Sequence, residues 1–504
     1  MRATTVLLAL LLTAAVLWSS QQAAPRRSRA SIADTHAAAP IPRETGSGGE
    51  QLPAHRVTQR FRSPLALQLF VVKPWTDDVV EWLSETPSPD GVAVRGVWGV
   101  RPLAPTTLAN LIEGLRGSGV RALELNHHCE VAKGDLALLA QLPELVWLSV
   151  SRGTVTADSL SAIGRLRGLR YLDLFGCGLR DELEPLRNLV HLETLDLSRN
   201  LVGDEGAHHL SALPSLERLH LRQSMLTAEG YRALVAAPRL RHLELGSDYS
   251  NAAALAGLAG HRTLESIEFS FQDDFTPESI AHLQLLPALA HLKLDYCERE
   301  WPLEQYRQLG ALRGLRSLAL RHTEITDSGL LELTGFRDLE VLEFVEPAIT
   351  DAGMNHLLAF PRLRSLALWD AEITDDGMRV CTRLPHLTEV SLIGHSNVTD
   401  AGLAYLPSGI VHLSVHGAGI REPDFSRFER LETLWLWDSG IGDSGLASLS
   451  RLVSLRELDL ARTRVTAAGL QHLAAVSRLE ALDVRETPAA SSIPNWLRRR
   501  IERD

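Results

Sequence analysis

The sequence predicts an α/β solenoid, in which short parallel strands form a curved stack and helices cover its outer side. Two observations lead to this prediction: an apolar motif recurs at a nearly constant spacing, and each recurrence is followed by residues typical of a turn and a helix start. By length alone, 504 residues would suggest about three domains. A solenoid grows by adding repeats, so one continuous unit accounts for this length equally well.

The recurring motif is L-x-x-L-x-L, with leucine or a similar apolar residue at each L and intervals of 21 to 26 residues. Its first position falls at Val120, Leu145, Leu169, Leu192, Leu216, Leu240, Leu264, Leu289, Leu315, Leu339, Leu363, Leu387, Ile410, Leu431, Leu455 and Leu479. Residues two apart in a strand share one face, so the last two leucines of each motif are expected to point into the core. We therefore predict about sixteen repeats over residues 120–487.

The unit 315–333 shows how one repeat is expected to fold. Leu318 and Leu320 point inward from a short strand, and Thr323 is a small polar residue that can satisfy backbone groups in the turn. Thr326 or Asp327 is expected to cap a helix. Gly329 lets that helix approach its neighbour closely. Similar helix starts recur at 349–354, 373–378, 398–403 and 441–446.

These repeats resemble the leucine-rich repeat family, over roughly residues 95–487. The Thr-Asp-x-Gly-Leu helix start is similar to that of the cysteine-containing subgroup, found in F-box adaptors and many bacterial repeat proteins. The resemblance implies a curved solenoid with parallel strands on the concave face and helices on the convex face. It also implies a binding protein rather than an enzyme.

The chain before the repeats is expected to contain three segments. Residues 1–24 hold an apolar run, Ala3–Trp18, that suits a signal peptide or a signal anchor. Residues 25–60 lack apolar periodicity and are predicted to form a disordered tether. Residues 61–119 are predicted to form an N-terminal cap with a degenerate repeat. At the other end, residues 488–504 are predicted to form a capping helix, because a terminal repeat would otherwise expose apolar side chains.

Charge and motifs exclude several classes of function. The net charge of −11 disfavours a nucleic-acid partner, since phosphate binding needs a positive surface. The sequence holds no nucleophile elbow, P-loop, zinc-protease motif or dinucleotide turn, so we expect neither catalysis nor a cofactor. The run Asn126–Glu130 contains two histidines and a cysteine, but adjacent strand residues point to opposite faces, which disfavours a metal site.

The candidate binding site is a patch on the concave face of the later repeats. Exposed tryptophans on a strand that faces water indicate a binding surface, since tryptophan is enriched at binding hot spots. The alternative is that the rings pack on one another and bind nothing. The patch comprises Trp369, Asp370, Ile393, His416, Trp435, Trp437 and Asp438.

A second set of residues occupies the middle strand position of the earlier repeats. It comprises Asp173, Asp196, His220, Glu244, Glu268 and Lys293, and we refer to it as the acidic column. Like charges on neighbouring strands repel, and a cationic partner would relieve this. The alternative is a solvated face compensated by Arg170, Arg218 and Arg241.

The sequence therefore predicts a protein-binding scaffold, exported to the periplasm, cell envelope or extracellular space, or tethered to a membrane by an uncleaved signal segment. Its ligand would be a protein held on the concave face. The alternative is an intracellular, F-box-like substrate adaptor of a ubiquitin ligase. Residues 61–118 show mixed strand and helix signals rather than a compact helical module, which disfavours the adaptor. The oligomeric state is left open.

Overall fold

The computed structural model describes residues 135–497 apart from 154, 247–250, 271–274, 296–300, 395–396 and 418, together with 119–125, single residues between 109 and 116, and strands at 56–62, 68–73 and 91–94. The predicted signal segment, most of the tether, the run at 126–130 and the end of the predicted C-terminal helix lie outside these residues. The chain divides into two units, Met1–Leu52 and Pro53–Asp504, and the second is described here.

One sheet of 19 strands runs through the unit 53–504, and every strand pairs with the strand before it in the sequence. β1 and β2 are antiparallel, and all later pairings are parallel. The strands are β1 Arg56–Arg62, β2 Gln68–Lys73, β3 Gly91–Val94, β4 Ala122–Leu125, β5 Trp147–Val150, β6 Tyr171–Asp173, β7 Thr194–Asp196, β8 Arg218–Arg222, β9 His242–Gly246, β10 Ser266–Ser270, β11 His291–Asp295, β12 Ser317–Arg321, β13 Val341–Val345, β14 Ser365–Trp369, β15 Glu389–Ile393, β16 His412–Val415, β17 Thr433–Trp435, β18 Glu457–Asp459 and β19 Ala481–Asp483.

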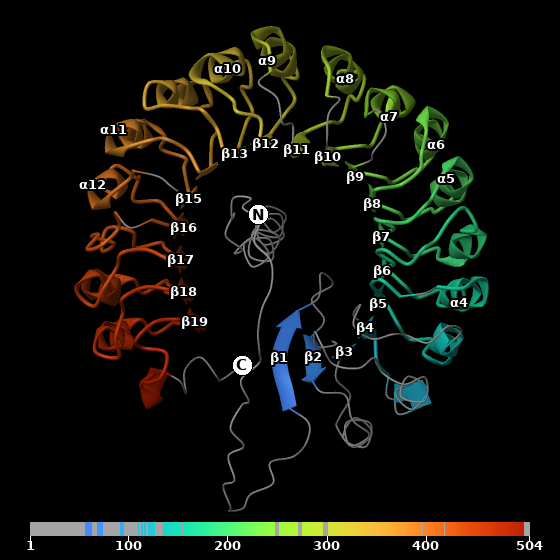
Figure 1. The fold of residues 1–504 in the computed structure, drawn as a ribbon, viewed down its shortest axis with the longest axis horizontal. Coiled ribbons are helices and arrows are strands. Elements are labelled where there is room, and N and C mark those ends of the chain that lie inside the picture. Colours follow the sequence, from blue (N-terminus) through green and yellow to red (C-terminus); the bar gives the residue numbers. More distant parts are fainter. Residues whose placement is uncertain are drawn as a thin grey trace, which may run out of the picture. The chain divides into compact units, whose positions relative to one another are not determined.

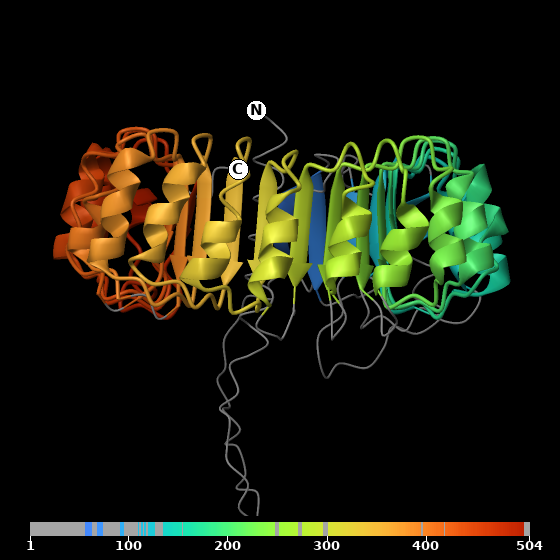
Figure 2. The same cartoon turned by 90° about the horizontal axis from the view of Figure 1, so that it is seen from above.

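Helices cover one side of this sheet, and the strands line the inner side of the arc (Figures 1 and 2). Some are α-helices and others are 3₁₀-helices. The α-helices are α4 Ala157–Ile163, α5 Asp204–Ser211, α6 Ala228–Leu234, α7 Asn251–Leu258, α8 Pro277–Leu283, α9 Leu303–Gly310, α10 Asp327–Glu332, α11 Asp375–Met378 and α12 Asp400–Leu403. The 3₁₀-helices are η1 Asp135–Gln141, η2 Glu184–Asn188, η3 Gly353–Ala359, η4 Arg379–Arg383, η5 Ser444–Arg451 and η6 Gly469–Ala475.

The repeat period determines where the strands lie. Each of the strands β4 to β19 begins two residues after a first position of the apolar motif, from Val120 before β4 to Leu479 before β19. One motif therefore yields one strand, and the parallel pairing follows because every strand returns through a helix on the same side of the sheet. The predicted α/β solenoid is confirmed.

The core is a continuous column of apolar side chains between the sheet and the helices. In the unit 315–333, Leu318 and Leu320 from β12 are both fully buried, as are Ile325 from the turn and Leu330 from α10. Burial of one such side chain contributes about 1.5–3 kcal/mol. Because the same positions are filled in each repeat, neighbouring repeats form one uninterrupted core rather than separate domains.

The Thr-Asp-x-Gly helix start links successive repeats. Thr326 caps α10, because its hydroxyl accepts the Gly329 N–H at 3.3 Å. Asp327 instead reaches the next repeat, where its carboxylate accepts the Thr350 N–H at 2.9 Å and the Thr350 hydroxyl at 2.7 Å. The same aspartate-to-threonine link joins residues 204 to 227, 351 to 374, 375 to 399 and 443 to 466.

The two ends of the described chain differ in part from the sequence analysis. Strand β1 begins at Arg56, so residues 56–60, predicted to belong to the tether, lie in a strand that pairs with β2. Backbone pairing in a hairpin does not need apolar periodicity, which is why the composition did not reveal it. At the C-terminus, Leu497 is fully buried, and Ile493 and Trp496 pack against the core.

Two cysteines are expected to be chemically inert in the folded protein. Cys177 and Cys381 are buried, and burial raises the pKa of each thiol to about 12. At pH 8 only about one molecule in 10⁴ would carry the reactive thiolate at either position. Iodoacetamide at pH 8 should therefore leave both cysteines unmodified, as measured by peptide mass spectrometry, and should label both in urea. Labelling of the folded protein at the rate of a free thiol would contradict this.

Candidate functional site

The predicted patch lies on four adjacent strands of the concave face. Trp369 ends β14 and lies opposite Ile393, which ends β15. His416 follows β16, and β17 carries Trp435 two residues before Trp437. The three tryptophans are half-buried and lie outside the hydrophobic core. Strand alternation places them on the face opposite the core leucines, so their rings are available at the surface of the sheet.

His416, Trp437 and Asp438 form a compact cluster. The imidazole of His416 stacks on the indole of Trp437, with ring centroids 4.1 Å apart and planes at 14°. The Gly394 N–H donates to Nδ1 of His416 at 3.2 Å, so Nε2 carries the proton and donates to the Asp438 carboxylate at 2.9 Å. The stack presents a flat, oriented surface held by polar contacts at both ring nitrogens.

Trp369 is held separately from this cluster. Its Nε1 donates to the Ser391 hydroxyl at 3.0 Å, and the guanidinium of Arg321 lies 5.3 Å from its ring centroid. Among the residues that the structure describes, no ring contact or hydrogen bond joins Trp369 to His416 or Trp437. The patch therefore consists of two aromatic anchors with Ile393 between them, rather than one stack of tryptophans.

Asp370 and Asp438 occupy a row of residues in the left-handed backbone region. Their φ angles are 54° and 53°, and the equivalent positions on the two strands between them are Gly394 and Gly417. A side chain other than glycine costs about 1 kcal/mol in this conformation. Both aspartates are exposed, so the carboxylates are kept at the edge of the patch despite this cost.

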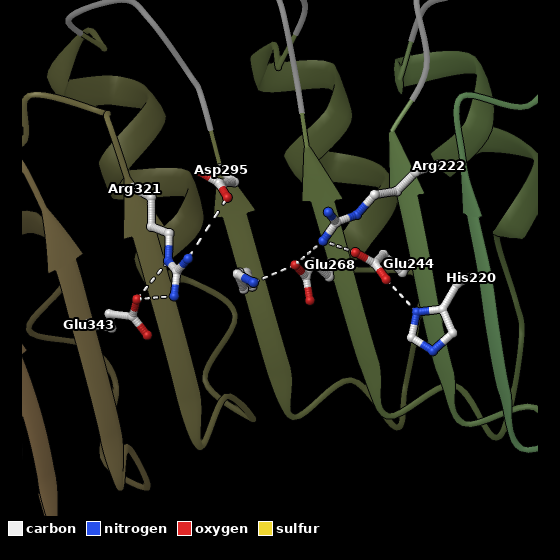
Figure 3. Close-up of polar contacts among 8 residues, drawn as sticks. His220, Arg222, Glu244, Glu268, Asp295, Arg321 and Glu343 are labelled. Carbon is white, nitrogen blue, oxygen red and sulfur yellow. Dashed lines mark hydrogen bonds and ion pairs between the residues drawn. The ribbon is translucent and has the colours of Figure 1, made fainter. Parts of the chain in front are cut away.

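A network of ion pairs occupies the concave face before the patch (Figure 3). It consists of two separate groups. The first joins His220, Arg222, Glu244, Glu268 and Lys293, and the second joins Asp295, Arg321 and Glu343. Arg222 bridges Glu244 and Glu268, the latter at 2.9 Å, and Lys293 also contacts Glu268. Burial would raise the pKa of Glu268, but Lys293 and Arg222 outweigh it and hold that pKa below its usual range.

The second group, on β11, β12 and β13, lies beside the patch. Arg321 donates through Nε to Glu343 at 2.6 Å and lies 3.9 Å from Asp295. Glu343 is only 5% exposed, so this pair is desolvated. The same guanidinium lies over Trp369, so it connects the first aromatic anchor to Glu343 and Asp295.

The acidic column is compensated by different residues from those expected. Arg170 pairs with Glu193 and Arg241 with Glu265, both in exposed pairs away from the column. The compensating cations are Arg222 and Lys293. Arg222 lies two residues after His220 on β8 and shares its face, whereas Arg170 and Arg241 precede their strands.

At the earlier end of the column, no cationic side chain of the described residues pairs with the two aspartates. Asp173 and Asp196 are register neighbours on β6 and β7. Burial and then the Asp196 charge raise the pKa of Asp173, although the hydroxyls of Ser149 and Ser151 donate to its carboxylate at 2.7 and 3.2 Å. This end of the concave face is therefore negative.

A cavity of about 570 Å³ lies at the C-terminal end of the concave face. Its lining includes Trp435, Glu457, Asp459, Asp483, Arg485 and Ile493. Trp435 was predicted from the sequence as a site residue, whereas these carboxylates were not. Asp459 and Asp483 occupy the same repeat position as the residues of the acidic column, so extending that column to the last two repeats would have identified them. Glu457 is the first residue of β18.

Within the described residues, no group of three or more histidine, cysteine, aspartate or glutamate side chains could hold a metal ion. The run at 126–130 lies outside them. No helix in the described part of the chain combines the length and the apolar character needed to cross a bilayer.

The chain is similar in sequence to one family of repeats and in structure to several repeat proteins. A family model described as Leucine Rich repeat matches residues 188–211 and 313–333. No curated protein shows significant similarity to this chain. An internalin from Listeria monocytogenes is similar in structure, with 23% identity, a TM-score of 0.38, and coverage of 68% of this chain and 88% of the internalin.

Two further solved structures are similar. One is a TLR13–ssRNA13 complex, with 17% identity and a TM-score of 0.44, covering 73% of this chain and 62% of that one. The other is the ectodomain of the plant receptor kinase GASSHO1/SCHENGEN3 from Arabidopsis thaliana, in complex with CASPARIAN STRIP INTEGRITY FACTOR 2. It has 16% identity and a TM-score of 0.33, covering 80% of this chain and 57% of that one.

The architecture defines an α/β solenoid protein with a structured concave face. The family-model matches, together with the sixteen strands β4 to β19 that follow one motif each, support the leucine-rich repeat family.

Proposed function

We propose that this protein is a binding scaffold that holds a protein ligand on its concave face, with the patch as the anchoring surface. The observation that carries the proposal is the pair of aromatic anchors, Trp369 and the His416–Trp437 stack, which are oriented by polar contacts yet lie outside the core. Half-buried tryptophans fixed in this way offer large apolar contact area at little entropic cost, as at binding hot spots.

The test compares the full-length chain with a Trp369→Ala/Trp437→Ala variant as baits for affinity capture. A ligand captured by the unmodified chain is then purified, and its Kd is measured for both proteins. We expect the variant to bind at least roughly thirtyfold more weakly, since one lost hot spot is worth about 2 kcal/mol. Equal affinity for both baits would contradict the proposal.

Two further variants separate binding from folding. Leu331→Ala removes an exposed apolar side chain of α10 and should bind normally. Asp370→Gly/Asp438→Gly removes both patch carboxylates while keeping the left-handed backbone, which glycine adopts freely. That variant should fold with an unchanged circular dichroism spectrum and should lose affinity if the carboxylates contact the ligand.

We further propose that the scaffold is exported or held at a membrane by residues 1–24. The apolar run after Met1-Arg2 supports this. The alternative is an intracellular adaptor. The Thr-Asp-x-Gly helix starts support it, because they resemble the cysteine-containing subgroup of leucine-rich repeats, whose members include such adaptors. Fractionation of the tagged chain separates the two locations: recovery in an exported or membrane fraction is expected, and recovery in the cytoplasm would favour the adaptor.

A further inference from the structure

The cavity at the end of the concave face combines an aromatic wall with carboxylates. Trp435 is half-buried and forms one side. Asp459 lies directly opposite Trp435 in the β17–β18 register, and Asp483 lies opposite Asp459 on β19. Neighbouring strands are about 4.8 Å apart, so the indole and the two carboxylates follow one another across the floor of the cavity.

The charges around this cavity are only partly compensated. Arg485 pairs with Asp483, its Nε lying 2.7 Å from Oδ2. In the described residues, neither Glu457 nor Asp459 has a cationic side chain in contact. Burial raises the pKa of Asp459, and Asp483 adds to this, whereas the Ala461 N–H and the charge of the nearby Arg485 act in the opposite direction. The cavity therefore carries net negative charge. On strands β8 to β13, by contrast, the carboxylates are paired with cations.

Elsewhere on the concave face, a cation occupies a similar site between an indole and a carboxylate. Arg321 lies over the indole of Trp369 and bonds the carboxylate of Glu343 on the intervening strand. A planar guanidinium stacks on an aromatic face and bonds a carboxylate at the same time, which a lysine ammonium does less well. At the cavity the indole and the carboxylate are present, and the lining includes no cation free to join them, because Arg485 is engaged by Asp483.

We propose that this cavity binds an arginine side chain of the protein ligand, with the guanidinium over Trp435 and bonded to Asp459 and Glu457. This inference rests on the proposed function, because it gives the ligand its second point of attachment, beyond the patch. A guanidinium would supply the cationic partner that Glu457 and Asp459 lack among the described residues.

The experiment titrates the full-length, ¹⁵N-labelled chain with the peptide acetyl-Gly-Arg-Gly-amide and follows the Trp435 indole N–H by NMR. Trp435→Phe assigns the signal. The matched probe replaces arginine by citrulline, which has nearly the same shape without the charge. We expect the arginine peptide to move the Trp435 signal saturably and the citrulline peptide to leave it in place. Equal shifts with both peptides would overturn the proposal.

Variants locate the effect. Asp459→Asn should weaken arginine-peptide binding at least fivefold, and Glu457→Gln, an exposed position, repeats the test if the first variant folds poorly. Glu429→Gln, exposed and outside the cavity lining, should bind as the unmodified chain does. Unchanged affinity in both cavity variants would overturn the proposal.

The other source of arginine is the C-terminal run Arg498–Arg500. A full-length variant with these three residues changed to glutamine should leave the Trp435 signal unchanged before peptide is added. A shifted signal together with tighter peptide binding would show that the chain's own end occupies the cavity, which overturns the proposal. The peptide titration reads the cavity alone, so its outcome is independent of whether the patch variants lose their partner.

Discussion

Asn200→Ala is expected to lower the free energy of unfolding by about 3 kcal/mol. The Asn200 side chain is only 1% exposed, and its carbonyl accepts the Leu179 N–H at 2.9 Å. Its amide donates to the carbonyls of Leu174 and Leu197, both at 2.9 Å. Removing the side chain leaves these buried backbone groups unpaired, at about 1–3 kcal/mol each before any relief by water. Urea unfolding followed by circular dichroism measures the loss.

The control is the same turn position in a later repeat. Ser439 is also buried, but its hydroxyl makes no hydrogen bond within the described structure. Ser439→Ala should therefore change stability by less than about 0.5 kcal/mol. If both variants lost similar stability, the cost would come from side-chain volume in the turn, and the hydrogen-bond explanation of Asn200 would be wrong.

Gly353→Ala is expected to destabilise the protein by about 2 kcal/mol, although alanine is normally the better helix former. Gly353 begins η3, and a Cβ placed on it would lie 1.9 Å from Oδ1 of Asp327. The carboxylate would have to move, and it would lose its bonds to the Thr350 N–H and hydroxyl. The urea midpoint again provides the measurement.

A double-mutant cycle tests the cause of this loss. In an Asp327→Ala background the obstructing carboxylate is absent, so Gly353→Ala should cost at least about 1 kcal/mol less than it does alone. Gly442→Ala is the matched control, since a Cβ there meets no atom within 4 Å. Additive effects of the two substitutions would show that Asp327 and Gly353 do not interact in this way.

The patch could be placed from sequence because strand alternation is strict. Once Leu366 and Leu368 are assigned to the core, Trp369 must lie on the other face, and the structure places it there. The ring contacts could not be predicted. Whether Trp437 would stack on His416 or on Trp435 depends on rotamers and on the Gly394 N–H, which comes from a different repeat.

The sequence also could not predict which cations pair with the acidic column. Any arginine near the acidic column could have served, and Arg170 and Arg241, two of those expected from the sequence, pair with other carboxylates. The selection of Arg222 depends on its position on β8 relative to Glu244 and Glu268, two strands that the fold brings side by side. The sequence pattern predicts the face of the sheet on which a side chain lies. Its ion-pair partner depends on the length and direction of both side chains.

The amino-acid sequence by itself determined the solenoid, its repeat boundaries and the face on which each leucine lies, because a period of about two dozen residues leaves one arrangement that buries every apolar position. Only the tertiary structure decided how Asp327 and its equivalents join one repeat to the next, which cations neutralise the concave face, and that Trp435 borders a cavity with Asp459 and Asp483. Those features depend on distances between repeats, and such distances exist only after the chain has stacked.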